Sequence, residues 1–192
     1  MKPIRLAIFA SGSGSNAQRL MAYFANHNRI SIALVVCNKA GAGVFDHAKK
    51  AQIPAVLLQN RSDYESNVVG ELLRENSIDF IVLAGFLLKI PDSLIEQFPE
   101  KMVNIHPSLL PKFGGKGMYG IHVHRAVLEA GETQSGITIH LVDGHYDEGR
   151  VIDQVSCPVL PNDSPETLAL RVQQLEHLHF APAIENYLLH GR

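Results

Sequence analysis

Short apolar runs alternate with longer amphipathic segments along the first half of the chain. The apolar runs lie at residues 5–10, 30–37, 55–58, 80–84 and 102–105. The amphipathic segments, with apolar residues at helical spacing, lie at 16–25, 44–51 and 64–75. This alternation is typical of parallel strands joined by crossover helices. The sequence therefore predicts an α/β fold, a single doubly wound, Rossmann-like domain with a mostly parallel sheet and helices on both faces.

The pattern changes after the fifth strand. Residues 106–120 hold two prolines, four glycines and no apolar periodicity, which predicts a long loop. Ser164 followed by Pro165 predicts the start of a final helix, and Pro182 predicts a break or restart within it. The elements expected between this loop and the final helix are a helix at 121–130 and strands at 138–142 and 151–155.

Composition excludes several classes of protein. Hydrophobic residues make up 46% and charged residues 19% of the 192 residues, as in ordinary globular proteins. The net charge of -2, without a long basic run, disfavours a nucleic-acid partner. The apolar part of the N-terminus is too short for a signal peptide, and no run reaches transmembrane length. The two cysteines, Cys37 and Cys157, suit a reducing compartment. Because neither a signal peptide nor a transmembrane run is predicted, we expect a cytoplasmic protein without a membrane partner.

Ten histidines raise the question of a metal site. His122 and His124, like His177 and His179, are two residues apart within predicted helices. Residues at that spacing point in different directions from a helix. We therefore expect no metal in this protein.

A glycine-rich loop, Ser11-Gly12-Ser13-Gly14-Ser15-Asn16, follows the first predicted strand. Backbone N–H groups at a helix N-terminus opened by glycine can bind phosphate. Ala17 occupies the third glycine position of the dinucleotide fingerprint, and residues 37–39 offer no acidic group for a ribose diol. The loop also lacks the lysine of a P-loop. A mononucleotide or sugar phosphate therefore fits the loop better than NAD or ATP.

Asn104 and His106 lie two residues apart at the end of the fifth strand, so their side chains point to the same face. Pro107 ends the strand directly after the histidine. An amide and an imidazole in this place can both donate to one carbonyl oxygen, as in acyl transfer. A carboxylate near His106 would raise its pKa and favour the protonated donor. Asp143 and Asp147 follow a later strand, and spacing alone does not choose between them.

Several ordered motifs together resemble one family. They are Ser13-Gly14-Ser15-Asn16, Leu83-Ala84-Gly85-Phe86, the stretch Asn104-Ile105-His106-Pro107-Ser108-Leu109-Leu110-Pro111, His140 with Asp147-Glu148-Gly149, and Gln174-Leu175-Glu176-His177. In this order they are similar to the folate-dependent phosphoribosylglycinamide formyltransferases over essentially the whole chain. The resemblance implies transfer of the formyl group of 10-formyltetrahydrofolate to the amine of glycinamide ribonucleotide, in de novo purine synthesis.

The resemblance also implies roles for individual residues. It implies a catalytic trio of Asn104, His106 and Asp147. For the substrate's phosphate and ribose it implies Gly14, Ser15, Asn16 and Glu176. For folate it implies Arg61, Phe86, Leu87, Lys89, Ile90, Val142, Asp143 and Tyr146.

We accordingly expect residues 1–192 to form one formyltransferase domain, with a phosphate-binding part at about 1–100 and a folate and catalytic part at about 80–192. Its partners would be the two small substrates, and the protein would be a monomer or a homodimer. The main alternative is a 10-formyltetrahydrofolate hydrolase, which uses the same trio. Methionyl-tRNA formyltransferases and non-catalytic dinucleotide-binding modules fit less well. The former are expected to carry an RNA-binding domain, and the latter do not need the trio.

Overall fold

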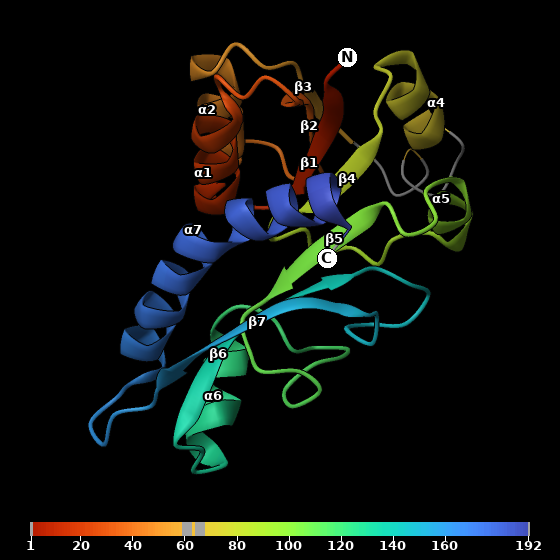
Figure 1. Ribbon diagram of the computed structural model, residues 1–192. Coiled ribbons are helices and arrows are strands. Elements are labelled where there is room, and N and C mark those ends of the chain that lie inside the picture. Colours follow the sequence, from red (N-terminus) through yellow and green to blue (C-terminus); the bar gives the residue numbers. More distant parts are fainter. Residues whose placement is uncertain (1, 59–62, 64–67, 192) are drawn as a thin grey trace. The chain divides into compact units, whose positions relative to one another are not determined.

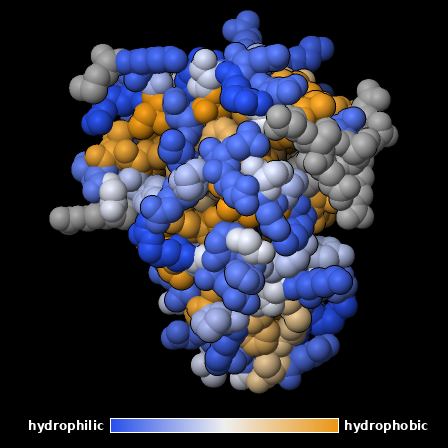
Figure 2. All heavy atoms as spheres, turned by 90° about the vertical axis from the view of Figure 1, so that its right-hand side faces the viewer, coloured by the Kyte–Doolittle hydropathy of each residue, from blue (hydrophilic) through white to orange (hydrophobic). Residues whose placement is uncertain are grey.

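The computed structural model describes residues 2–58, 63 and 68–191. Residues Met1–Val103 form one compact unit and Asn104–Arg192 form a second. No helix within the described part of the chain is both long and apolar enough to cross a membrane. Figure 2 shows one face of the molecule, where hydrophilic side chains predominate and hydrophobic atoms appear between them.

The first unit is built on parallel strands: β1 Ile4–Ala10, β2 Ile30–Cys37, β3 Ala55–Leu57 and β4 Phe80–Leu83. β1 lies between β2 and β4, and β3 pairs with the outer side of β2. Residues from Leu6 to Ala10 are fully buried, and every residue of β4 is buried. Such continuous burial explains why these strands are apolar throughout and do not alternate with polar residues.

Four described helices accompany these strands: α1 Ser15–Phe24, α2 Val44–Lys50, α4 Val68–Glu75 and α5 Asp92–Gln97. Figure 1 shows α1 and α2 on one side of β1 and α4 on the other. α1 buries Ala17, Leu20, Met21 and Phe24, the helical spacing on which its prediction rested. The predicted start of α4 at residues 64–67 lies outside the described residues. The sequence missed α5, because six residues are too few to show periodicity.

The second unit contains β5 Met102–His106, which begins in the first unit, β6 Gln134–Leu141, β7 Val151–Pro158, α6 Ile121–Glu129 and α7 Pro165–His190. β6 and β7 pair antiparallel, and both are longer than the predicted strands at 138–142 and 151–155. Their pairing runs from Gln134 opposite Pro158, so backbone hydrogen bonding extends past the apolar core of each strand. α7 packs against α6 and against both strands.

The prediction of a break at Pro182 is wrong. α7 continues from Pro165 to His190, although Figure 1 shows it changing direction along its course. Proline removes one backbone hydrogen bond from a helix. Phe180, Ala181, Ala183 and Ile184 around it are buried, so packing stabilises the helix across the interruption.

Hydrogen bonding orders the strands β3-β2-β1-β4-β5-β6-β7 in a seven-stranded mixed sheet. The pairs among β1 to β4 are parallel and the β6–β7 pair is antiparallel. The predicted α/β class and mostly parallel sheet are therefore confirmed. The segment after β5, expected as a loop, contains no helix or strand until α6 begins at Ile121.

Candidate active site

The glycine-rich loop of the first unit lies between β1 and α1, as predicted. Gly14 is the N-cap of α1 and has a left-handed φ of 78°. A Cβ atom at Gly14 would lie 2.7 Å from the Cβ of Val44 at the start of α2. Glycine is therefore needed at this position for both its conformation and the close approach of α2.

Ser11 connects this loop with two neighbouring strand ends. Its hydroxyl donates to Oδ1 of Asn38, after β2, at 2.6 Å, and accepts from the backbone N–H of Leu87, after β4, at 3.0 Å. Its own N–H donates to the carbonyl of Gly85 at 3.0 Å. β1 lies where the strand order reverses, between β2 and β4. Ligands of open α/β sheets bind at the carboxyl ends of the strands around such a reversal.

The folate residues predicted in the first unit follow β4. Phe86 is buried and packs edge-on against Phe9, with ring centroids 5.3 Å apart. Ile90 is buried, whereas Leu87 is exposed. Lys89 forms an exposed ion pair with Asp92 at 3.5 Å. Arg61 lies outside the described residues.

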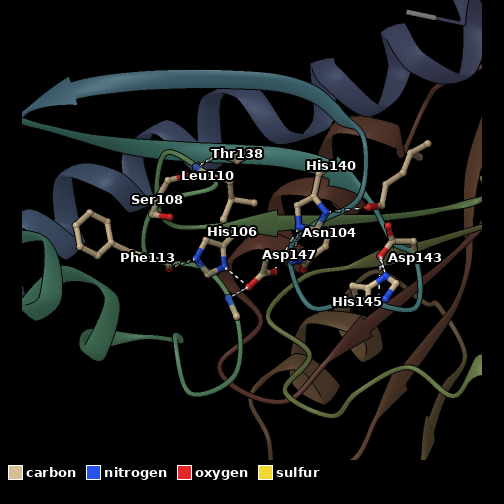
Figure 3. A network of polar contacts seen from close by, with 12 residues as sticks. Asn104, His106, Ser108, Leu110, Phe113, Thr138, His140, Asp143, His145 and Asp147 are labelled. Carbon is tan, nitrogen blue, oxygen red and sulfur yellow. Dashed lines mark hydrogen bonds and ion pairs between the residues drawn. The ribbon is translucent and has the colours of Figure 1, made fainter.

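In the second unit, His106 is held between two oxygen atoms at the end of β5 (Figure 3). Its Nε2–H donates to the carbonyl of Phe113 at 2.8 Å. Its Nδ1 lies 3.4 Å from Oδ2 of Asp147. The side chain is only 4% exposed. Both ring nitrogens thus face acceptors, an arrangement that suits a ring able to carry two protons.

Of the two aspartates that follow β6, Asp147 is the one that contacts His106. Oδ2 of Asp147 also accepts from the backbone N–H of Gly115 at 2.8 Å, and Oδ1 lies 3.5 Å from Nε2 of His140. Asp143 instead accepts from the N–H of His145 at 2.8 Å. Asp147 has a φ of 57°, a left-handed conformation that aspartate tolerates better than most residues.

His140 links Asp147 to the predicted asparagine. The register of β6 and β7 shifts between Ile139 and His140, an irregularity that re-aims side chains near functional sites. His140 Nδ1–H donates to the carbonyl of Leu141 at 2.8 Å. Its Nε2 lies 3.1 Å from Nδ2 of Asn104 and 3.5 Å from Oδ1 of Asp147. The structure therefore brings Asn104, His106 and Asp147 together around His140.

The pKa values in this cluster reflect competition between burial and charge. Burial lowers the pKa of His106, and the opposing effects of Asp147 and the Phe113 carbonyl do not overcome it. The expected effect of a neighbouring carboxylate is therefore present, since Asp147 raises the pKa of His106, but desolvation by burial is larger and the net shift is downward. Burial raises the pKa of Asp147, but its contacts with His140, His106 and Gly115 outweigh this and leave it below the usual value.

Thr138 and Gln154 are site residues that sequence reasoning missed. The Thr138 hydroxyl donates to the carbonyl of Ser108 at 2.7 Å and accepts from the N–H of Leu110 at 3.0 Å. Nε2 of Gln154 donates to the Thr138 hydroxyl at 2.8 Å and to the carbonyl of Leu110 at 3.0 Å. These contacts join the β6–β7 pair to the segment after His106. The alternation of side chains along β6 places Thr138 on the same face as His140, which is the signal that was available.

The remaining predicted residues of the second unit lie around this cluster or on α7. Val142 is half-buried, whereas Asp143 and Tyr146 are exposed. Glu176 is half-buried on α7. Gly149 ends the predicted Asp-Glu-Gly motif, and any Cβ there would overlap the carbonyl of Leu141. Across the described residues, no three His, Cys, Asp or Glu side chains are grouped to hold a metal ion.

Comparison with known proteins places the chain in a family. The profile of the formyl transferase family matches residues 4–184. The chain belongs to the formyl transferase family. The chloroplastic phosphoribosylglycinamide formyltransferase of Arabidopsis thaliana is 41% identical over 179 residues, which cover 90% of this chain and 61% of the relative. The corresponding protein of Vigna unguiculata is 41% identical over 94% of this chain and 60% of its own length.

Solved structures agree with this family assignment. A phosphoribosylglycinamide formyltransferase from Bacillus halodurans has a TM-score of 0.87 and 34% identity, covering 98% of this chain and 97% of that one. The chain described here spans about three fifths of the length of the two plant relatives, 61% and 60%. The family profile and the solved structures thus both support the formyl transferase fold, and the sequence-based prediction of the family is confirmed.

Proposed function

We propose that the protein transfers the formyl group of 10-formyltetrahydrofolate to the amine of glycinamide ribonucleotide, in de novo purine synthesis. Family membership and the names of the relatives support this reaction. The observation that carries it is the buried His106 ring, with Asp147 at Nδ1 and Asn104 joined to the same cluster through His140. A donor pair backed by a carboxylate suits acyl transfer to an amine.

His106 would act through Nε2. Its Nδ1 faces the Asp147 carboxylate, so Nε2 is the nitrogen that can donate to a substrate. Asn104 and His106 would stabilise the negative charge that develops on the formyl oxygen as the amine attacks. One such donor contributes about 3 kcal/mol to lowering the barrier in other enzymes. His106 would then donate a proton to the folate nitrogen as the bond to the formyl carbon breaks.

The Phe113 carbonyl occupies Nε2 of His106 in this structure, at 2.8 Å. His106 can donate to a substrate oxygen only after this hydrogen bond is exchanged. Binding of the substrate would therefore replace the Phe113 carbonyl as the acceptor at Nε2. The exchange keeps the ring nitrogen hydrogen-bonded throughout, which avoids the cost of an unsatisfied buried donor.

Asp147 would have two roles. Its pKa remains below the usual value despite burial, so it is ionised at neutral pH and stabilises the protonated form of His106. It would also orient the water that removes a proton from the attacking amine. No nucleophilic side chain is needed, and Cys37 and Cys157 are both buried on strands.

The substrates would bind at the positions that the family resemblance implies. The loop residues Gly14, Ser15 and Asn16 would hold the phosphate, which suits the α1 N-terminus beside the left-handed Gly14. Glu176 would bind the ribose hydroxyls. The proposed folate residues are Arg61, Phe86, Leu87, Lys89, Ile90, Val142, Asp143 and Tyr146.

We also propose that the protein works without a metal, as one cytoplasmic domain and as a monomer or homodimer. The two plant relatives are named chloroplastic, which is a property of those proteins. Sedimentation analysis of the purified chain distinguishes a monomer from a dimer. Activity that persists in EDTA would support the metal-free reaction.

Formyl transfer from 10-formyltetrahydrofolate, measured with and without glycinamide ribonucleotide, tests the proposed function. We expect tetrahydrofolate to appear only in the presence of the ribonucleotide. Equal release of tetrahydrofolate in both reactions would instead establish a 10-formyltetrahydrofolate hydrolase. No release in either would contradict the proposal.

A further inference from the structure

The segment 108–115, directly after β5, is attached to the β6–β7 pair by two side chains. Thr138 and Gln154 bind three of its backbone groups: the Ser108 carbonyl, the Leu110 N–H and the Leu110 carbonyl. Thr138 is fully buried on β6, whereas Gln154 is exposed on β7. The two residues are directly opposite each other in the antiparallel register. Opposite residues share one face of a sheet, which explains why both reach the same segment.

Gln154 has a role that Thr138 cannot fill. A threonine hydroxyl donates one hydrogen bond and accepts two. That of Thr138 donates to Ser108 and accepts from both Leu110 and Gln154, so its capacity is used. The Leu110 carbonyl therefore receives its hydrogen bond from Gln154, at 3.0 Å. The same amide nitrogen also donates to Thr138 at 2.8 Å and so orients the hydroxyl.

The segment 108–115 in turn supplies contacts to two ionisable groups of the candidate active site, His106 and Asp147. The Phe113 carbonyl accepts from His106, and the Gly115 N–H donates to Asp147. The segment also has a hydrogen bond within itself that spans Leu110, because the Ser108 hydroxyl donates to the Lys112 carbonyl at 2.7 Å. A shift at Leu110 would therefore be transmitted to the oxygen at Phe113 and the N–H at Gly115.

We propose that Gln154 is a positioning residue, which holds segment 108–115 so that the Gly115 N–H keeps Asp147, and through it His106, in the geometry needed for catalysis. The inference rests on the proposed function only for its kinetic consequence. The structural part concerns the hydrogen bonds of Gln154 and is independent of which substrate is used. Its donor N–H group, and not its bulk, is what matters.

Two variants separate the donor from the shape of the side chain. Gln154→Met removes both polar atoms at similar length, and Gln154→Glu keeps the shape but presents an acceptor in place of the donor. Because Gln154 is exposed at β7, we expect both variants to fold. Ser156→Ala is the matched control, since Ser156 is exposed on the same face of the same strand, two residues away.

Steady-state formyl transfer is the first measurement. Loss of a hydrogen bond that acts on catalytic geometry should lower kcat about five- to tenfold. We expect this in both Gln154 variants, with KM for both substrates changed by less than about twofold and Ser156→Ala like the wild type. Normal kcat in Gln154→Glu would overturn the proposal, because the shape alone would then suffice.

The second measurement does not depend on turnover. The titration of His106 is followed by NMR of its ring, assigned with a His106→Ala spectrum. The Phe113 carbonyl acts to raise the pKa of His106 within an overall shift that burial makes downward. Loosening that contact in Gln154→Met should therefore lower the pKa of His106, while Ser156→Ala leaves it unchanged. An unchanged titration in Gln154→Met would refute the positioning role even if the wild type showed no formyl transfer.

Discussion

Nδ1 of His106 lies 3.4 Å from Oδ2 of Asp147, and the opposite ring nitrogen donates to the Phe113 carbonyl. Both partners of this imidazole, Asp147 and Phe113, have a φ of 57°, in the left-handed region. Non-glycine residues persist in that conformation where the surrounding structure holds them, and they cluster at functional sites. The two strained positions therefore frame the ring on which the proposed chemistry depends.

His106→Gln should abolish most of the activity without unfolding the protein. Glutamine can donate a hydrogen bond but cannot deliver a proton at neutral pH. Loss of general acid catalysis is expected to lower kcat by a factor of about 10²–10⁴. Thermal unfolding by circular dichroism checks the fold. Near-normal kcat in a folded variant would exclude His106 as the proton donor.

Asp147→Asn should retain the fold and change the pH dependence. Asparagine also tolerates the left-handed conformation, so the backbone is preserved. The Asp147 carboxylate raises the pKa of His106 against the larger lowering effect of burial. Removing its charge therefore lowers that pKa further, and the alkaline limb of the kcat profile should move to lower pH. We expect kcat at neutral pH to fall about a hundredfold. A profile that does not move would show that Asp147 does not control the proton on His106.

Gly14→Ala should weaken binding of the ribonucleotide. The new Cβ would lie 2.7 Å from Val44 Cβ, and alanine disfavours the φ of 78°. Displacement of the loop should raise KM for glycinamide ribonucleotide about tenfold, with a smaller effect on kcat. Gly12→Ala is the matched control, because no atom lies within 4 Å of a Cβ there. Equal KM values in the two variants would argue against a phosphate site at Gly14.

His124→Leu should make stability less dependent on pH. His124 is buried in α6, and burial, with a smaller contribution from His106, lowers its pKa. A histidine whose pKa is lower when folded binds fewer protons than in the unfolded chain, so stability falls as pH decreases through about 6.5. The free energy of unfolding, measured with urea, should decrease between about pH 7.5 and 5.5 in both proteins. We expect the decrease in the variant to be smaller than in the wild type by on the order of 1 kcal/mol.

The exposed neighbour His122 provides the control for that experiment. His122→Leu should leave the pH dependence of unfolding as in the wild type. Some pH dependence should also remain in His124→Leu, because burial lowers the pKa of His106 as well. If the free energy of unfolding decreases with pH as much in His124→Leu as in the wild type, His124 does not contribute to the pH dependence of stability.

Much of the fold was predictable because the parallel strands are buried on both faces. Burial of this kind leaves apolar runs that stand out in the sequence, as at β1 and β4. β6 and β7 were predicted too short, because their ends are fixed by pairing with each other and not by hydrophobic pattern. Pro182 led to the wrong prediction of a helix break, because buried side chains around it stabilise α7 despite the hydrogen bond that proline removes.

The candidate site was predictable only where it depends on local spacing. Asn104 and His106 share a face because they are two residues apart on one strand. Gln154 was not predictable, since its position opposite Thr138 depends on the strand register and on the place of the irregularity before His140. The effect of a carboxylate on the pKa of His106 was predictable, but the larger effect of burial was not, because the sequence shows the neighbouring charge and not the depth of burial.

Transfer of a labelled formyl carbon tests the central claim most directly. The enzyme is incubated with ¹³C-formyl-tetrahydrofolate and glycinamide ribonucleotide, and the ribonucleotide is analysed by mass spectrometry. We predict that the label appears on the ribonucleotide amine with the wild type and is lost with the folded His106→Gln variant. Label recovered as formate, with the ribonucleotide unmodified, would contradict the account.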